Sequence, residues 1–338
     1  MSSGDSGRRM GGDSRSLVCT STLQEHDLLM EWKKRANRQM KRFPCSDQTT
    51  EAYDLSMTLK DSDELWRVLS SEVDKYGKSE ADKYGNSSVI SLDNQCARRG
   101  TASADAKVYL RASSTDVDVY LQIFKRHFLK LLYPLVDSEV KIEYILDGGA
   151  NCGMTTVLLA SMFPSATIVS VEPDPANFRV LRKNAGHLNN VHLVQAGLWD
   201  VTGKIVLKSS HGQWGRVFKR VEEDDDGDGD GLQAYSVADI LEQFDIPRFD
   251  LVKMDIEGSE AVVLGGKGDM TWLEDVKVFF AEVHDMFAGY FGLSEELQEV
   301  TEIVERAVGG WMDGPTRVMD NEHTLYFGSS VWTAIREE

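Results

Sequence analysis

Three acidic residues, Asp147, Glu172 and Asp255, each stand at or beside the end of a short apolar run in the second half of the chain. Short apolar runs of this kind predict buried strands. Because ligands of open α/β sheets bind at the carboxyl ends of the strands, carboxylates at such ends predict one shared site. A carboxylate there can accept hydrogen bonds from ribose hydroxyls or attract a cationic group. The sequence therefore predicts a site for a ligand that contains a nucleoside.

The turn after the first of these runs is rich in small residues. It reads Gly148-Gly149-Ala150-Asn151-Cys152-Gly153. Glycine reaches positive φ and lets a backbone approach a ligand closely, and asparagine tolerates the left-handed conformation that such a turn requires. An apolar run from Met154 predicts a helix next, and the free N–H groups at its start can face the ligand. Strand, turn and helix predict the first half of a nucleotide-binding unit.

The segments that must position these residues alternate between strand and helix patterns. The predicted strands are 143–148, 166–171, 190–195, 249–255 and 276–283. The predicted helices between them are 153–163, 175–186, 236–243 and 258–266. A helix over 294–308 precedes two further strands, 315–319 and 323–332, which predict an antiparallel hairpin. The pattern indicates a Rossmann-like, doubly wound α/β fold with a mostly parallel seven-stranded sheet and a C-terminal antiparallel hairpin.

A strand at 107–111 and a helix that begins near Thr115 are predicted before the first nucleotide-binding strand. Thr115 and Asp118 have the spacing of a capping box. Apolar residues at helical spacing continue to about Leu132, and Pro134 is expected to end the helix. We expect this lead-in helix to lie against the sheet.

The first 105 residues have a different character. Residues 1–20 are rich in Gly and Ser and predict disorder, whereas 23–40 and 52–77 predict helices. Residues 71–77 are nearly repeated at 79–85, which we interpret as a local duplication in a flexible linker that reaches about Asp105. The chain is thus expected to divide into an N-terminal extension, 1–105, and an α/β domain, 106–338.

Composition argues against several classes of protein. The 338 residues carry a net charge of −18, which disfavours general attraction to nucleic acid or to an anionic membrane. The sequence contains no run of about 20 apolar residues, so it predicts no membrane span. The four cysteines lack pairing or metal-ligand spacing and indicate free thiols in a reducing compartment. Residues 1–16 lack the apolar core of a secretory signal, so we expect a cytoplasmic protein, with organelle targeting left open.

An acidic run from Asp224 to Gly231 matches the start of a calcium-binding EF-hand loop. Counted from Asp226, however, the twelfth position is Val237, where such a loop needs a bidentate Glu. The seven histidines show no metal-ligand spacing either. We therefore expect a solvated acidic loop and no metal site.

Two cofactors fit the glycine-rich turn. From Gly148 the turn reads Gly-x-Ala-x-x-Gly, which is a weak match to the fingerprint of an NAD(P)-binding oxidoreductase. Asp147, before the first glycine, suits the ammonium group of S-adenosylmethionine better than a pyrophosphate. The closing antiparallel hairpin also fits a class I methyltransferase sheet better than an all-parallel dehydrogenase sheet. The sequence favours S-adenosyl-L-methionine.

Five segments carry a resemblance to a known family. They are 146–153, 171–178, 196–200, 251–260 and 281–284. The first has the form Asp-x-Gly-Ala-Asn-x-Gly and the fourth the form Lys-x-Asp-x-Glu-Gly-x-Glu. As a pair they resemble the FkbM family of S-adenosylmethionine-dependent methyltransferases, over roughly 107–284. The resemblance implies methyl transfer, mostly to hydroxyl oxygens of small molecules or sugars.

The resemblance also implies roles for individual residues around the cofactor. Asp147 and Gly149 would hold its methionine part, and Glu172 would bind its ribose. Pro173 and Leu198 would lie near the adenine. Ala150, Asn151 and Gly153 would form the turn around the methionine part. Gly148 is also expected to contact the cofactor, although the family commonly has a larger apolar residue at this position.

A hydroxyl acceptor also needs a group that takes its proton. Asp255, Glu257 and His284 are the candidates, since all lie at predicted strand ends, and Asp255 would also sit close to the sulfonium. One alternative is a methyltransferase fold that has lost activity and acts as an adaptor through residues 1–105. An oxidoreductase is a second alternative. The sequence indicates neither the acceptor nor the oligomeric state.

Overall fold

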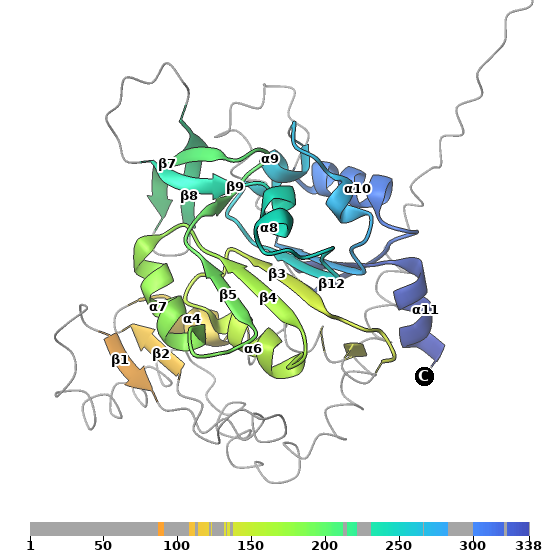
Figure 1. Cartoon of the computed structure of the whole chain (residues 1–338), viewed down its shortest axis with the longest axis horizontal. Coiled ribbons are helices and arrows are strands. Elements are labelled where there is room, and N and C mark those ends of the chain that lie inside the picture. The colour runs from red at the N-terminus through yellow and green to blue at the C-terminus, as the bar shows by residue number, and fades with distance from the viewer. Residues whose placement is uncertain are drawn as a thin grey trace, which may run out of the picture.

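The computed structural model describes residues 87–90, 108–111, 114–121, 123, 132, 134–135, 138–211, 215–221, 231–265, 267–282, 300–320 and 323–337. They form a layered α/β structure in which a central sheet has helices on both faces (Figure 1). Within these ranges, no helix has the length and apolar character that a bilayer span requires. Several predicted features lie outside the described residues: the helices over 23–40 and 52–77, the repeat at 71–85, the acidic run 224–230 and His284.

Seven strands make the central sheet, as predicted. In order across it they are β12 (Thr316–Asp320), β13 (His323–Phe327), β11 (Val278–Glu282), β10 (Leu251–Met254), β3 (Tyr144–Gly148), β4 (Thr167–Val171) and β5 (Val191–Val194). The strands from β11 to β5 are parallel, and β13 is antiparallel to both of its neighbours. The strand order reverses between β3 and β10, and such a switch point is where ligands of these sheets bind.

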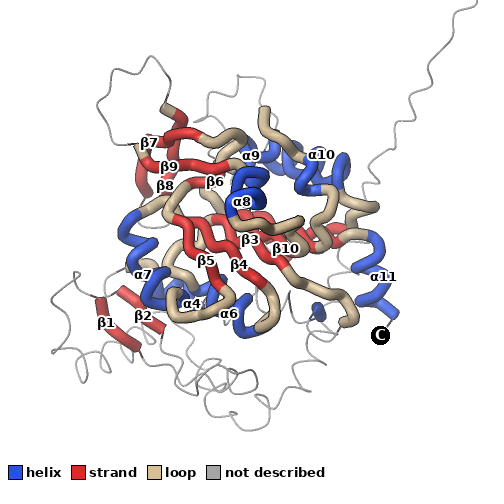
Figure 2. Tube along the Cα trace, viewed as in Figure 1, coloured by secondary structure: helices blue, strands red, loops and turns tan. Residues whose placement is uncertain are grey.

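The two faces of the sheet bury alternate residues of each parallel strand. Ile145 packs into one apolar cluster and its neighbour Leu146 into the other. The helices that pack on the first face are α4 (Asp116–Leu121), α6 (Met154–Met162), α7 (Pro175–Ala185) and α11 (Ser329–Glu337). On the second face are α8 (Val237–Gln243), α9 (Glu260–Gly265), the short 3-10 helix Thr271–Leu273 and α10 (Val300–Trp311). Figure 2 shows the strands in red between these helices.

A second sheet, which the sequence pattern does not predict, comes from the segment between β5 and α8. Its four strands are β6 (Gly197–Leu198), β9 (Leu232–Tyr235), β7 (Gly203–His211) and β8 (Gly215–Arg220), in that order. Trp199, Ile205 and Phe218 belong to a small core of this sheet. Figure 1 shows β7, β8 and β9 together at the upper left, beyond the ends of β4 and β5. We call it the small sheet.

The C-terminal prediction is wrong after Phe327, where the expected strand gives way to α11. Val331 and Ile335 lie one helical turn apart, and both are buried in the first apolar cluster. The N–H of Trp332 donates to the carbonyl of Gly328 at 2.9 Å. Helical spacing therefore buries the apolar residues of this segment, although its Val, Trp and Ile favour a strand locally.

The lead-in segment differs from its prediction in two details. Thr115 Oγ1 has no hydrogen-bond partner, so the capping box is wrong. Ser114 Oγ instead donates to the carbonyl of Arg111 at 2.8 Å and accepts the N–H of Asp116 at 3.2 Å. Pro134 and Leu135 are themselves helical, so helical structure does not end before Pro134.

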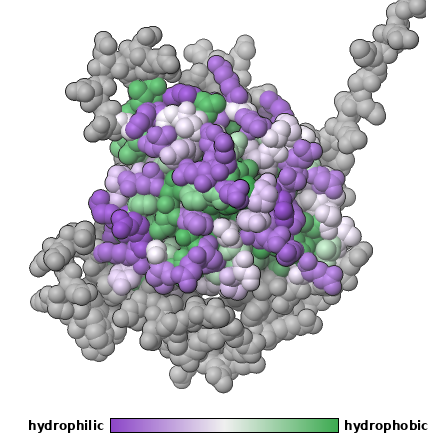
Figure 3. Space-filling view, viewed as in Figure 1, coloured by the Kyte–Doolittle hydropathy of each residue, from purple (hydrophilic) through white to green (hydrophobic). Residues whose placement is uncertain are grey.

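The predicted strand at 107–111 is confirmed as β2 (Val108–Arg111). It pairs antiparallel with β1 (Ser87–Ile90), which lies within the residues predicted as linker. The linker prediction is therefore wrong at 87–90. On the face seen in Figure 3, hydrophilic residues cover much of the described surface, and hydrophobic residues show between them near its centre.

Candidate functional site

A pocket opens at the carboxyl ends of the parallel strands, beside the switch point. Seven predicted site residues line it: Gly149, Asn151, Glu172, Pro173, Leu198, Asp255 and Glu257. It encloses about 580 Å³ of empty space, part of which is open to solvent. Four other predicted residues do not line it; Asp147, Gly148, Ala150 and Gly153 belong to the strand, turn and helix start behind it.

The glycine-rich turn is held tightly between two strands. The N–H groups of Gly149 and Ala150 both donate to the carbonyl of Val171 at 3.0 Å. Gly149 has a φ of +73°, and a Cβ there would lie 1.7 Å from the carbonyl oxygen of Asp255. Asn151 has a φ of 50°, which confirms the left-handed conformation expected of it. The turn can thus present its backbone to a ligand without a side chain at Gly149.

Close packing also explains two further glycines of this turn. Gly148 is buried in β3, and a Cβ there would lie 2.5 Å from Leu198 Cδ1. Gly153 has a φ of +90°, and its Cβ would lie 2.8 Å from Leu181 Cδ1. These positions serve the packing of the small sheet and of α7 against the turn.

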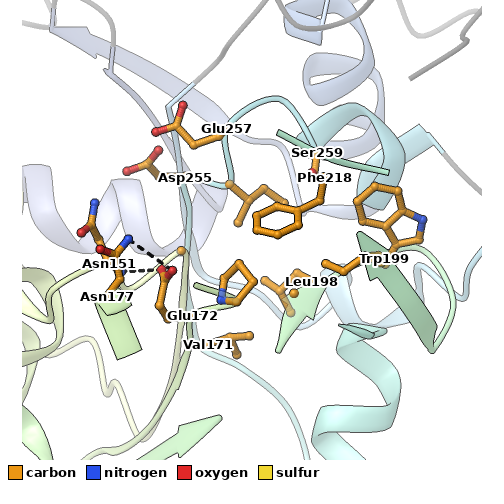
Figure 4. Close-up of a pocket in the computed structure, with 15 residues that line it drawn as sticks. Asn151, Val171, Glu172, Asn177, Leu198, Trp199, Phe218, Asp255, Glu257 and Ser259 are labelled. Carbon is orange, nitrogen blue, oxygen red and sulfur yellow. Dashed lines mark hydrogen bonds between the residues drawn. The ribbon is translucent and has the colours of Figure 1, made fainter. Parts of the chain in front are cut away.

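Glu172 places a buried carboxylate in the wall of the pocket, with 5% of the residue exposed. Its Oε1 accepts the N–H of Asp174 at 2.8 Å, and its Oε2 accepts the N–H of Asn151 at 2.8 Å. Asn177 Nδ2 lies 3.4 Å from Oε1 (Figure 4). Burial raises the pKa of Glu172 to about 7, and the two N–H donors oppose that rise.

The start of α7 fixes this arrangement locally. Asp174 caps the helix, because its Oδ1 accepts the N–H groups of Ala176 at 3.0 Å and Asn177 at 2.8 Å. Pro175 is the first helical residue, as its sequence position predicts. The cap orients the backbone between Glu172 and Asn177, so both side chains reach the pocket.

Arg111, which the sequence prediction missed, connects the lead-in segment to the pocket. Its Nε and Nη2 donate to the carboxylate of Asp116, which is 0% exposed. Nη2 also donates to Asn177 Oδ1 at 2.8 Å. Because a guanidinium only donates, it turns the Asn177 amide so that its NH₂ group faces Glu172. Arg111 thereby orients one donor to the pocket carboxylate.

Asp147 is placed differently from its prediction. Its carboxylate is 0% exposed, and its Oδ2 accepts the hydroxyl of Thr156 at 2.6 Å. Its Oδ1 lies 3.7 Å from Lys253 Nζ. Burial raises the pKa of Asp147, opposed by the charge of Lys253 and the bond from Thr156. Asp147 therefore contacts Thr156 and Lys253 behind the pocket and is not among the residues that line it.

Asp255 and Glu257 lie near each other above Glu172 in Figure 4 and give one side of the pocket an acidic character. The Asp255 side chain is 27% exposed, and its Oδ2 lies 3.3 Å from Lys253 Nζ. Glu257 has a φ of 57° and Gly258 a φ of 92°, so two consecutive residues are left-handed here. A non-glycine residue held in that conformation is strained, and such strain is common at functional sites.

The small sheet supplies an apolar wall that the sequence prediction found only at Leu198. Trp199 follows β6 and Phe218 lies on β8, and both line the pocket. Figure 4 shows Phe218 and Leu198 on the side away from Asn151 and Asn177. No local pattern marks these residues, because a pairing between β6 and β9 brings the sheet to the pocket. The pocket thus offers an apolar surface, a buried carboxylate and an acidic side.

Comparison with known proteins places this site in a family. Residues 147–308 match the model of the methyltransferase FkbM domain. Methyltransferase sdnD of Sordaria araneosa is 26% identical, over 50% of this chain and 76% of that protein. Methyltransferase 1 of Beauveria bassiana is 29% identical over 38% of this chain and 60% of its own length. The 31-O-demethyl-FK506 methyltransferase FkbM of Streptomyces tacrolimicus is 25% identical over 43% and 66%.

Solved structures of methyltransferases also show likeness to the chain. The O-methyltransferase TomG of Streptomyces achromogenes matches with a TM-score of 0.33 and 16% identity, over 59% of this chain and 77% of TomG. The family match shows that residues 147–308 of this chain form a methyltransferase domain of the FkbM family, and these relatives are methyltransferases as well.

Proposed function

We propose that this chain transfers the methyl group of S-adenosylmethionine to a hydroxyl oxygen of a small molecule or a sugar. The observation that carries the proposal is Glu172, a buried carboxylate that lines a pocket at the switch point of the sheet. A carboxylate there can accept both hydroxyls of a ribose. Two relatives, the FK506 enzyme and the 2-O-methyltransferase NoeI of Sinorhizobium fredii, carry names that describe O-methylation, which supports an oxygen acceptor.

The pocket fits each part of this cofactor. Glu172 would hold the ribose, and Pro173 and Leu198 would contact the adenine beside it. The backbone at Gly149 and Asn151 would follow the methionine part. Asp255 would face the positive charge of the sulfonium and the ammonium group. When bound, the cofactor supplies a methyl group that the sulfonium already activates.

Asp147, Gly148, Ala150 and Gly153 would support the cofactor from behind the pocket. Their contribution is to hold the turn, since they do not line the cavity. Asp147 keeps its predicted importance, but it would act through Thr156 and Lys253.

The protein's own part in the reaction is to align the acceptor and to take its proton. Asp255 lines the pocket with a carboxylate that is 27% exposed, which suits it to face a positive charge. We propose Glu257 as the proton acceptor, because it lines the same side of the pocket and is fixed in a strained conformation. His284 stays a prediction, since it lies outside the described residues.

Isothermal titration of the whole chain with S-adenosylmethionine tests the proposal. We expect saturable binding, and we expect Glu172→Ala to weaken it by roughly tenfold or more, because a hydrogen bond to a charged group is lost. No heat at high micromolar cofactor would contradict an enzyme and favour the adaptor alternative. Heat with a nicotinamide cofactor instead would favour an oxidoreductase.

The acceptor requires a separate search. Incubating the protein with cofactor and metabolite extracts, followed by mass spectrometry, should reveal a product heavier by one methyl group. Glu172→Ala protein gives the matched control. We further propose a cytoplasmic location, supported by cysteines without pairing spacing and by Cys152, which is buried as a free thiol.

A further inference from the structure

Lys253 is a buried lysine in the middle of the central sheet. It lies on β10, where its neighbours in register are Asp147 on β3 and Phe280 on β11. Only 3% of the residue is exposed. A lysine is almost never fully buried without partners, because an unpaired buried charge is strongly unfavourable. Its contacts should therefore explain its place in the sheet.

The Lys253 ammonium joins the glycine-rich turn to the acidic side of the pocket. It donates to the carbonyl of Gly148 at 3.1 Å and to that of Gly149 at 2.7 Å. Its third neighbour is Asp255 Oδ2, at 3.3 Å. An ammonium has three donors, and these three oxygens can take all of them. The N–H of Asp255 also donates to the carbonyl of Gly148, at 3.2 Å.

Three carboxylates face the ammonium from the elements around it. They belong to Asp255 after β10, Asp147 on β3 and Glu282 at the end of β11. Burial alone would lower the pKa of Lys253, but these three charges outweigh it and hold the pKa above its ordinary value. The lysine is therefore charged, and it balances the buried charge of Asp147.

We infer that Lys253 is a positioning residue for the cofactor: it fixes the Gly148–Gly149 carbonyls and the Asp255 carboxylate in one geometry. This inference rests on the proposed function, since Asp255 and the turn are the parts proposed to hold the methionine end. One ammonium offsets only part of the charge of the three carboxylates around it, so the side of the pocket that Asp255 lines stays negative.

A double-mutant cycle measures this role through S-adenosylmethionine affinity. Lys253→Met keeps an unbranched side chain, one atom shorter, and removes the charge. We expect it to weaken binding by roughly ten- to hundredfold, because charge-assisted hydrogen bonds that hold the site are lost. Asp255→Asn should weaken binding too. The double variant should bind no worse than the weaker single variant, because Asp255 is already misplaced without Lys253.

Lys277→Met is the matched control. Lys277 Nζ lies 2.8 Å from Asp250 Oδ1, and Asp250 immediately precedes β10, at the end of the sheet away from the pocket. This variant should lower the urea midpoint of unfolding while leaving cofactor affinity within twofold of wild type. In a double variant, the effects of Lys277→Met and Asp255→Asn on the free energy of cofactor binding should simply add.

A pH series separates positioning from a general loss of stability. Without Lys253, the buried Asp147 lacks its counter-charge, so the folded state takes up a proton there. The urea midpoint of Lys253→Met should therefore fall, relative to wild type, as the pH rises. The double variant Asp147→Asn/Lys253→Met should regain the urea midpoint that Lys253→Met loses at high pH. It should still bind the cofactor weakly, because nothing holds Asp255 and the turn in place.

The outcomes distinguish the two claims. If the wild-type chain binds no cofactor, the proposed function fails. If wild type binds and the folded double variant Asp147→Asn/Lys253→Met binds equally well, the role of Lys253 is overturned while the function stands. The role of Lys253 would also be overturned if Lys253→Met and Asp255→Asn weakened cofactor binding by amounts that add in the double variant. The neutral double variant keeps the test valid if Lys253→Met does not fold.

Discussion

At the scale of single residues, Glu172 gives a signal that can be measured without any ligand. Burial raises its pKa from 4.5 to about 7, so the unfolded chain loses this proton first as the pH rises. Between these two values the folded state holds one more proton than the unfolded state. Stability therefore falls with rising pH across that window.

Glu172→Gln removes this titration and isolates its effect. The free energy of unfolding of wild type relative to the variant should fall by on the order of 3 kcal/mol as the pH rises from 4.5 to about 7. Above that window the difference should level off. Urea unfolding of both proteins without cofactor, repeated over this pH range, measures the difference. If the free energies of unfolding of the two proteins changed with pH in the same way, a buried, protonated Glu172 would be contradicted.

Two glycines make a second pair of predictions at this scale. Gly149→Ala would place a Cβ 1.7 Å from the carbonyl of Asp255, at a φ of +73°. We expect this variant to lose several kcal/mol of stability, since backbone atoms must move. Gly310→Ala is the control, because nothing lies within 4 Å of its Cβ and it sits in α10. It should gain roughly 0.5–1 kcal/mol. Thermal unfolding of both variants tests the contrast, and equal effects would contradict it.

At the scale of elements, β2 and α4 reach the pocket through one arginine. Arg111→Met would leave Asp116 buried without its partner and Asn177 without its donor. Breaking one side of a buried pair costs about 3–5 kcal/mol, so we expect a marked loss of stability. Cofactor binding should weaken as well, because Asn177 no longer keeps its amide toward Glu172.

An exposed arginine on α7 provides the comparison for this variant. Arg179→Met should change stability by no more than about 0.5 kcal/mol and leave cofactor affinity unchanged. Urea unfolding and titration calorimetry of the two variants give the answer. If Arg111→Met bound cofactor as tightly as Arg179→Met, the lead-in segment would have no role in orienting Glu172.

The elements also show what the sequence could and could not predict. The central strands were predictable because each is a short apolar run between turn signals, as in Leu251–Met254. The small sheet was not, since β6 pairs with β9 across a long separation and β7 contains a register shift between Leu207 and Ser209. Local patterns carry no signal for such pairing.

The candidate site also contains residues that the sequence could predict and residues that it could not. Glu172 and Asp255 were predictable because a carboxylate at a strand end is visible in the sequence. Lys253 was not recognised, because its acceptors Gly148 and Gly149 lie 105 and 104 residues away and meet it only when β10 pairs with β3. The burial of Asp147 also depends on that pairing, so its distance from the cavity could not be read from its position in the turn.

At the scale of the whole molecule, the pocket is assembled from three parts of the fold. The parallel sheet supplies the turn and the carboxylates, and the small sheet supplies the apolar wall. The lead-in segment supplies Arg111 behind Asn177. Because β1 pairs with β2, we propose that this third part begins before the predicted boundary at 105 and includes residues 87–90.

That pairing makes the domain boundary testable with two shortened chains, one of residues 87–338 and one of residues 106–338. The second lacks β1, so β2 loses the backbone hydrogen bonds of a four-residue ladder, each contributing about 1 kcal/mol. We expect it to unfold at lower urea and to aggregate more readily, because an exposed strand edge remains. Both should bind S-adenosylmethionine with similar affinity once folded, since both contain the described residues that line the pocket, from Gly149 to Ser259. Equal stability of the two chains would place the boundary at 105 after all, with β1 outside the cooperative unit.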